Sequence, residues 1–208
     1  MRIGLDIDGV LADFSRAAAA VFVSVTGRNL IPVNFGDLTV PVWLWWEHYG
    51  YTKDEARTAL DYIHRSSDFW LNLWPLPDAN TLRFLLSGFE RQHELYFITR
   101  RDGDRVKRQT ELWLFDHLKY PINVSGVWPT VLIVGYREKG AMAKALQLDI
   151  YVDDNCDNAN DVVRQSPATR MYLVSRAHNQ GVGGIEPAVT RVGTLGEVFD
   201  TEHAKGTL

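Results

Sequence analysis

The stretch RIGLDIDGVLADF, residues 2–14, decides the fold. Its apolar run from Ile3 to Ile7 is typical of a short buried strand, and the end of that run carries two aspartates one residue apart, Asp6 and Asp8. Burying like charges at the end of an apolar strand is costly unless a cation neutralises them. The stretch therefore predicts a buried strand that leads into a metal site.

The composition of the chain is that of an ordinary globular protein. The 208 residues are 46% hydrophobic and 23% charged, with a net charge of −4, and their number allows one sizeable domain or a core domain with a smaller appendage. We expect neither stable nucleic-acid binding nor membrane binding, because the chain has no global basic field and no apolar stretch of the roughly 20 residues that span a bilayer. With the single cysteine Cys156 and no signal-peptide layout, we expect a cytoplasmic protein. A homodimer stays open.

Strand and helix patterns alternate along most of the chain. Strands are predicted at residues 2–7, 93–100, 131–135, 149–154 and 170–175, and helices at 14–26, from a capping Asp78 onwards, and at 104–117, 138–147 and 155–164. This alternation predicts an α/β fold with a parallel sheet and helices on both faces. The tail from His178 onwards, with its Gly-Val-Gly-Gly run, is predicted to be irregular.

Residues 28–75 differ from the rest of the chain. They hold five of the seven tryptophans and two proline-marked stretches, and they suggest short helices at 42–49 and 53–65. We therefore expect a core domain formed by residues 1–27 and 76–208, with residues 28–75 inserted as a small, helical, aromatic-rich cap.

Polar residues follow the predicted strands at their carboxyl ends, which is where open α/β sheets bind ligands. In chain order they are Asp6, Asp8, Thr99, Arg100, Arg101, Lys139, Asp153 and Asp154. Carboxylate oxygens suit Mg²⁺, and a hydroxyl with a compact ammonium suits a phosphate. Two alternatives stay open: the last two aspartates could cap the following helix, and the two arginines could form a solvated basic edge.

The residues DIDGV at 6–10, then Thr99, Lys139 and the pair Asp153-Asp154, resemble the four ordered motifs of the haloacid dehalogenase-like (HAD-like) phosphohydrolases, across residues 6–154. Within that superfamily, DIDGVLADF and the later FWLNLWPLPDA are similar to the 5′(3′)-deoxyribonucleotidases. The resemblance implies a Rossmann-like core with a small cap in the position of residues 28–75. Where those nucleotidases have a small hydroxyl residue after the motif II threonine, this chain has Arg100, which we expect to add a second cation for a phosphate.

The resemblance also implies a role for each motif residue. Asp6 would be the nucleophile, Asp8 the acid and base for the leaving oxygen and for water, and Thr99 and Lys139 the clamp on the phosphoryl oxygens. The cofactor would be Mg²⁺, held by the Asp6 carboxylate, the Asp8 backbone carbonyl and Asp154, with Asp153 supporting the site.

The cap would close over the substrate and exclude water. Candidates to stack on a nucleobase are Trp43, Trp45, Trp46, Tyr49, Phe69 and Trp70, with Phe69 and Trp70 preferred, and Phe14 could face the substrate as well. The alternative is that these aromatic residues form the core of the cap.

These residues together predict a Mg²⁺-dependent phosphomonoesterase that acts on a small phosphorylated partner, a nucleoside monophosphate with the deoxy form preferred. Three alternatives stay open: a phosphatase for a sugar phosphate, a phosphatase for a nucleic-acid 3′-phosphate end, and a receiver-type signalling domain phosphorylated on aspartate. The receiver is disfavoured because Asp8 is placed to act as an acid and base and because a receiver has no place for an insert of nearly 50 residues. A catalytically inactive binding module is disfavoured because every motif residue is present.

Overall fold

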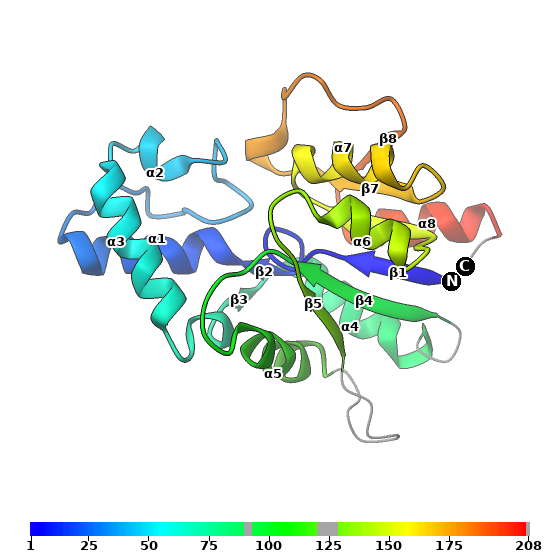
Figure 1. Cartoon of the computed structure of the whole chain (residues 1–208), viewed down its shortest axis with the longest axis horizontal. Coiled ribbons are helices and arrows are strands. Elements are labelled where there is room, and N and C mark those ends of the chain that lie inside the picture. Colours follow the sequence, from blue (N-terminus) through cyan, green and yellow to red (C-terminus); the bar gives the residue numbers. More distant parts are fainter. Residues whose placement is uncertain (90–92, 120–128, 207–208) are drawn as a thin grey trace.

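The computed structural model describes residues 1–89, 93–119 and 129–206. A parallel sheet of six strands forms its centre, in the order β5-β4-β1-β6-β7-β8 (Figure 1). The strands are β1 (Arg2–Leu5), β4 (Glu94–Thr99), β5 (Thr130–Ile133), β6 (Ile150–Asp153), β7 (Arg170–Val174) and β8 (Val189–Val192). The predicted α/β class and parallel sheet are confirmed.

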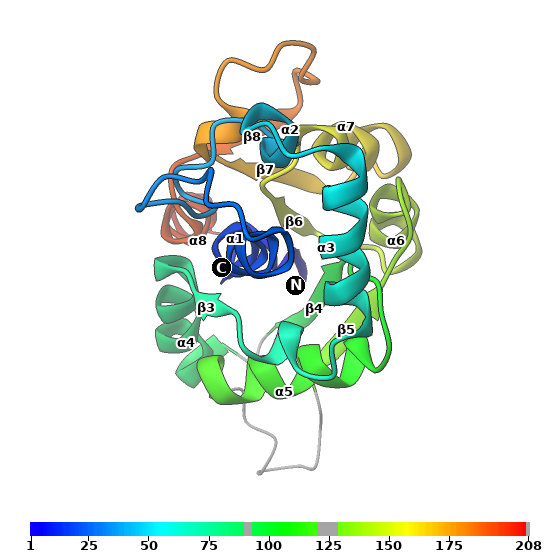
Figure 2. The same ribbon diagram turned by 90° about the vertical axis from the view of Figure 1, so that its left-hand side faces the viewer.

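Helices cover both faces of this sheet (Figure 2). On one face lie α4 (Pro77–Phe89), α5 (Val106–Leu118) and α8 (Leu195–Ala204), and on the other lie α6 (Lys139–Ala145) and α7 (Cys156–Gln165). The two-residue period of the strands divides their side chains between the faces. In β6, for example, Ile150 and Val152 join the first core while Tyr151 joins the second.

A helical insertion follows β1, whereas the sequence placed the insert after the helix at residues 14–26. It contains α1 (Phe14–Thr26), α2 (Trp45–His48) and α3 (Lys53–Arg65), then the short 3₁₀ helix η1 (Phe69–Leu71). The antiparallel ribbon of β2 (Ala12–Asp13) and β3 (Trp74–Pro75) ties its two ends together. Helix α1 packs against α3, and both lie beyond the carboxyl ends of the sheet strands (Figure 1). The exact boundary of a separate cap stays a prediction.

The prediction that the tail from His178 is irregular was wrong. After η2 (Ala177–Asn179) and a loop, β8 pairs in parallel with β7 and α8 packs beside α4. The strand is four residues long at the sheet edge, and its apolar signal is weak because Thr190 and Arg191 are exposed. The helix has a clearer start, since the Thr194 hydroxyl accepts a hydrogen bond from the Glu197 backbone.

The prediction that Asp78 caps a helix was also wrong. Pro77 begins α4, and Asp78 lies in its first turn. The Asp78 carboxylate accepts hydrogen bonds from the Leu195 backbone at 2.9 Å and from Arg176 at 2.7 Å, so it joins α4 to the C-terminal elements. Among the helices in the described ranges, none is long and apolar enough to cross a membrane.

Candidate active site

Three acidic side chains meet where β1 and β6 end. Asp6 follows β1, Asp153 ends β6, and Asp154 comes next. The backbone N–H of Asp6 donates to Val152 at 2.9 Å, which continues the pairing of the two strands up to the acids. All three carboxylates are buried, and each offers an oxygen within 4.8 Å of the others. Two adjacent strands of one sheet therefore create the acidic cluster that the sequence predicted.

Lys139, the first residue of α6, supplies an ammonium to this cluster. Its Nζ lies 2.6 Å from Asp6 Oδ2 and 2.8 Å from Asp153 Oδ2, and the side chain is buried. Burial lowers the pKa of Lys139, but the two carboxylates more than offset this and raise it well above its ordinary value. The lysine therefore stays protonated in the site.

The single positive charge of Lys139 does not neutralise the negative charge of the three clustered carboxylates. Burial raises the pKa of Asp6 well above its ordinary value; Lys139 opposes this, while Asp153 and Asp154 add to it. Burial likewise raises the pKa of Asp153. The unbalanced negative charge is what a divalent cation would relieve.

The arrangement of the oxygens fits such a cation. Asp154 Oδ1 is buried, and no hydrogen-bond partner reaches it from the described residues. Both Asp153 oxygens are already engaged, by Lys139, the Asn155 backbone and Asn158. Asp6 also has both oxygens engaged, by the Ile7 N–H and by Lys139, so Asp154 Oδ1 is the oxygen best placed to bind an ion that prefers oxygen ligands.

The loop after the acids leaves no room for a side chain. Gly9 has φ of +77°, and a Cβ there would lie 1.9 Å from Asp154 Oδ2. Arg176, which is buried, donates from Nε to the Gly9 carbonyl at 2.7 Å and from Nη2 to Asp78. The glycine lets the loop approach the acidic cluster, and the arginine fixes it there.

Asp8 stands apart from the three clustered acids. Its carboxylate accepts two hydrogen bonds from Arg101, from Nη2 at 2.7 Å and from Nε at 2.8 Å. The Thr99 hydroxyl donates to Asp8 Oδ2 over 3.4 Å and is buried at the end of β4. The predicted residues Asp6, Asp8, Thr99, Lys139, Asp153 and Asp154 therefore all lie at one edge of the sheet, while their roles stay predictions.

Arg100 and Arg101 differ in burial and in the residues that they contact. Arg100 is exposed and lies over the Tyr136 ring at 5.1 Å, whereas Arg101 is 2% exposed and contacts Asp8. The sequence pattern favoured Arg100 for substrate binding and did not assign Arg101. The two-residue strand period held the missing signal, because Arg101 follows Thr99 by two positions and so turns to the same side.

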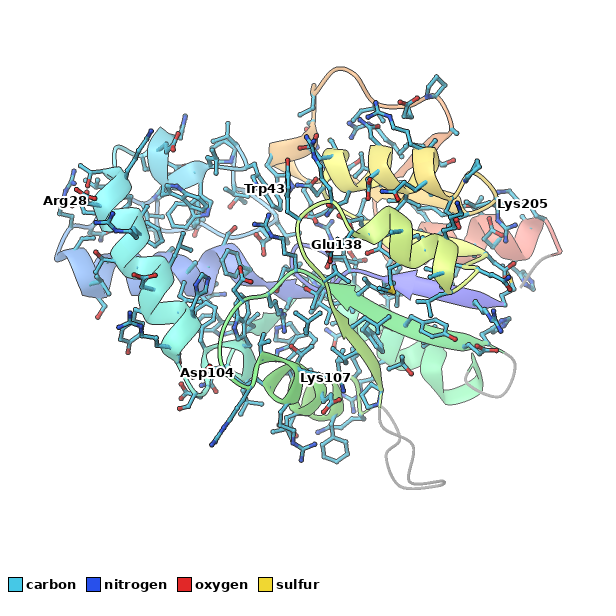
Figure 3. The ribbon with its side chains drawn as sticks, viewed as in Figure 1. Arg28, Trp43, Asp104, Lys107, Glu138 and Lys205 are labelled. Carbon is cyan, nitrogen blue, oxygen red and sulfur yellow. The ribbon has the colours of Figure 1, made fainter. Side chains whose placement is uncertain are left out.

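A cavity opens beside the acids. Its lining is Asp8, Gly9, Phe14, Ser15, Asp37, Val40, Trp43, Trp45, Trp46, Asp154 and His178. Trp43 lies in the loop before α2 (Figure 3), and its ring contacts that of His178, with centroids 5.3 Å apart. The insert therefore forms the aromatic wall of a cavity whose floor is the acidic edge of the sheet.

The predicted aromatic contacts divide into two groups. Phe14 and Trp45 line the cavity, although Trp45 is 1% exposed and packs against Phe22 and Phe35. Phe69 and Trp70 are buried and contact the Phe14 ring, with centroid distances of 6.1 and 5.6 Å. In this structure Phe69 and Trp70 thus pack against Phe14, and the contact of Phe69 and Trp70 with substrate stays a prediction.

His178 is a site residue that the sequence analysis did not select. Its Nε2 lies 3.2 Å from Asp154 Oδ2, and the side chain is buried. Burial lowers the pKa of His178, but the contacts with Asp154 outweigh it and raise the pKa above its ordinary value. The position of His178 just beyond β7 is another strand end, so the rule that located the aspartates could have located it.

Asp37, a buried acid, is a second site residue that no sequence pattern indicated. Its N–H donates to Asp13 at 2.8 Å, and its carboxylate accepts the Ser15 backbone N–H at 3.3 Å. Burial, with the nearby Asp13 charge, raises the pKa of Asp37 to about 8. At neutral pH the cavity wall therefore contains a protonated carboxyl group.

We expect Asp37→Asn to stabilise the protein at pH 8 and to have a smaller effect at pH 5. With a folded-state pKa of about 8 against an ordinary 3.8, the folded state keeps a proton that the unfolded chain releases, so stability falls as pH rises through this window. The amide does not ionise and escapes this loss, at about 1.4 kcal/mol per pKa unit. Thermal midpoints between pH 5 and 8 check this, with the exposed Asp61→Asn as control. If Asp37→Asn shifted the thermal midpoint equally at every pH, the raised pKa of Asp37 would be contradicted.

No family model and no curated protein sequence matches this chain. Solved structures do. YfnB of Bacillus subtilis, a HAD-type protein bound to magnesium, aligns with 97% of this chain and 98% of its own at 14% identity and a TM-score of 0.58. A predicted phosphatase from Clostridium acetobutylicum aligns over 98% of both chains at 13% identity and a TM-score of 0.58.

A third match is the D,D-heptose 1,7-bisphosphate phosphatase from Burkholderia thailandensis. It aligns with 98% of this chain and 97% of its own at 12% identity and a TM-score of 0.51. At these identities the likeness concerns the fold. The chain has the haloacid dehalogenase-like fold, a six-stranded parallel sheet with helices on both faces and a helical insertion after β1.

Proposed function

We propose that the protein is a Mg²⁺-dependent phosphomonoesterase that hydrolyses nucleoside monophosphates through an aspartyl-phosphate on Asp6. The observation that carries the proposal is the convergence of Asp6, Lys139 and Asp154 in a buried cluster, in which Asp154 Oδ1 has no hydrogen-bond partner among the described residues. An acid outside this cluster, Asp8, lies beside it and lines the cavity. Nucleophile, cation site and proton-transfer group thus stand at one sheet edge, as phosphoryl transfer requires.

In the first half of the reaction, an Asp6 oxygen attacks phosphorus and the bond from phosphorus to the ester oxygen breaks. Asp8 gives its proton to that oxygen, so the alcohol leaves neutral. In the second half, water attacks phosphorus and passes its proton to Asp8, and the bond from phosphorus to Asp6 breaks. The products are one alcohol and one inorganic phosphate per ester and water consumed, and both aspartates return to their starting forms.

The remaining residues hold the phosphoryl group and its charge. Asp6, the Asp8 carbonyl and Asp154 would hold Mg²⁺, which supplies charge neutralisation between the carboxylate nucleophile and the phosphate when bound. The Lys139 ammonium lies 2.6 Å from Asp6, and the Thr99 hydroxyl donates to Asp8 over 3.4 Å. They would bind the equatorial oxygens in the transition state.

The cavity supports a substrate with an aromatic group. Phe14, Trp43, Trp45 and Trp46 are among its lining side chains. A nucleobase stacked on such a wall gains about 1–3 kcal/mol for each contact. A second candidate is a sugar phosphate, which the heptose bisphosphate phosphatase of the same fold supports. A receiver domain is not supported, because Asp8 and the insert-lined cavity would have no role in it.

A panel of monophosphates tests reaction and substrate together. With Mg²⁺ we expect deoxynucleoside monophosphates to give the highest kcat/KM, above ribonucleotides and sugar phosphates. Chelation should lower turnover at least about a hundredfold, as a metal contribution of a few kcal/mol implies, and added Mg²⁺ should restore it. Full activity in the chelator would contradict the reaction, whereas a preference for sugar phosphates would correct the substrate alone.

A further inference from the structure

Arg101 is the one cation that grips the Asp8 carboxylate among the described residues. Its side chain is fully buried, while that of Asp8 is 20% exposed. The guanidinium offers Nη2 to one carboxylate oxygen at 2.7 Å and Nε to the other at 2.8 Å. This two-point contact fixes the position and the plane of the carboxylate, which a single hydrogen bond would not do.

The guanidinium is itself held from two other directions. Nη1 donates to the Thr110 hydroxyl of α5 at 2.8 Å, and the group lies over the Trp70 ring at 4.8 Å. Trp70 in turn is anchored, because its backbone N–H donates to the Gln109 side chain at 3.0 Å and its ring N–H to the Asp102 carbonyl at 3.3 Å. The arginine is therefore held by three partners, Asp8, Thr110 and Trp70, while Asp8 also lines the cavity.

We propose that Arg101 is the positioning residue for Asp8 in both proton transfers, an inference that rests on the proposed function. Asp8 has to meet the ester oxygen in the first half of the reaction and water in the second. A shift of about 1 Å in a reacting group can cost about a hundredfold in rate, so the support of Asp8 matters as much as its presence. Arg101 acts through Asp8 and makes no bond to the reacting atoms.

The test uses two probe esters that share a ring and differ in the leaving group. p-Nitrophenyl phosphate releases a stabilised phenolate that needs little protonation, whereas p-nitrobenzyl phosphate releases an alcohol that needs the Asp8 proton. In Arg101→Met we expect turnover of the benzyl ester to fall about a hundredfold or more. With the phenyl ester, the first turnover should keep its wild-type rate and the steady state should fall, because water activation is impaired and phosphorylated Asp6 accumulates.

This split between the two esters separates positioning from a purely structural role. Arg101→Lys should recover part of the benzyl-ester activity, since an ammonium can hold one Asp8 oxygen. Arg164→Met is the matched control, because Arg164 is exposed and pairs with Glu186 on the surface, and it should match the wild type on both esters. Equal losses of the first-turnover rate on both esters in Arg101→Met, or no loss on either, would overturn the inference.

Thr110→Val carries the test if the Arg101 variants fail to fold. It keeps both charged partners and removes only the hydroxyl that supports Nη1, so we expect the same split between the esters with a loss of up to about tenfold. An unchanged Thr110→Val in that case would overturn the inference. A wild-type protein that hydrolyses neither ester with Mg²⁺ would overturn the proposed function and this inference together, whereas wild-type turnover with equal losses would overturn this inference alone.

Discussion

Replacing Asp6 by asparagine is expected to lower turnover by about four orders of magnitude or more while the protein stays folded. The amide cannot form the phosphoryl ester, so both halves of the reaction lose their nucleophile. The fold should tolerate the change, because asparagine can still accept the Ile7 N–H that Asp6 accepts at 2.7 Å. Removing one of three buried carboxylates also relieves repulsion within the cluster.

Steady-state turnover and thermal unfolding, measured together, check this prediction. Asp200→Asn is a matched control, since Asp200 is exposed on α8, and both its activity and its stability should stay near wild type. Normal turnover in Asp6→Asn would mean that the nucleophile has been wrongly assigned. Loss of activity with loss of fold would leave the role of Asp6 unproven and would contradict the expected tolerance.

The second large effect concerns stability. Lys139→Met should lower the free energy of unfolding by about 3–5 kcal/mol and abolish turnover, because it leaves buried carboxylates without their ammonium. Lys139 is 2% exposed and pairs with both Asp6 and Asp153. Urea unfolding measures the effect, and Lys144→Met, at an exposed position of the same helix, should change stability by no more than about 0.5 kcal/mol.

A double variant sharpens this prediction. In the Lys139→Met background, Asp6→Asn removes one of the carboxylates that lost its partner, so it should regain part of the lost stability. In the wild-type background the same substitution breaks the 2.6 Å ion pair. The two effects of Asp6→Asn should therefore differ by an interaction energy of about 0.5–3 kcal/mol. Additive effects would show that the lysine and the aspartate do not stabilise one another.

Much of the fold followed from local pattern. Apolar runs of four to six residues, separated by helical spacing, located five of the six strands and the helices between them. The sixth strand was missed because it lies at the sheet edge, where Thr190 and Arg191 are exposed and the apolar signal is weak. That segment is a strand because it pairs with β7, which is a tertiary contact.

The site followed from the rule that strand ends converge, which placed the acids, Thr99 and Lys139 together. The rule predicts where these side chains lie but not which residues they contact. It could not say that Arg101 would turn inward onto Asp8 while Arg100 faces solvent, or that Trp70 would pack against Arg101. Those outcomes depend on how α5 and η1 pack under the site, over sequence separations that no local pattern records.

The insert was the least predictable part. Its tryptophans predicted either a small aromatic core or the wall of a binding site. The structure contains both, since Trp45 is packed inside and Trp43 is half exposed at the cavity. Asp37 carried no signal in the sequence, because its raised pKa depends on burial beside Asp13. Burial of a polar group in an insert is decided by the packing of the whole insert.

The central claim is that Asp6 carries the phosphoryl group, and rapid acid quenching tests it most directly. Asp8→Asn protein, mixed with ³²P-labelled p-nitrophenyl phosphate and Mg²⁺, should retain close to one label for each chain, since the amide cannot activate the water that releases it. Borohydride reduction and peptide mapping should then locate the label at Asp6. Phenolate release without protein-bound phosphate, or a label on any other residue, would contradict the account.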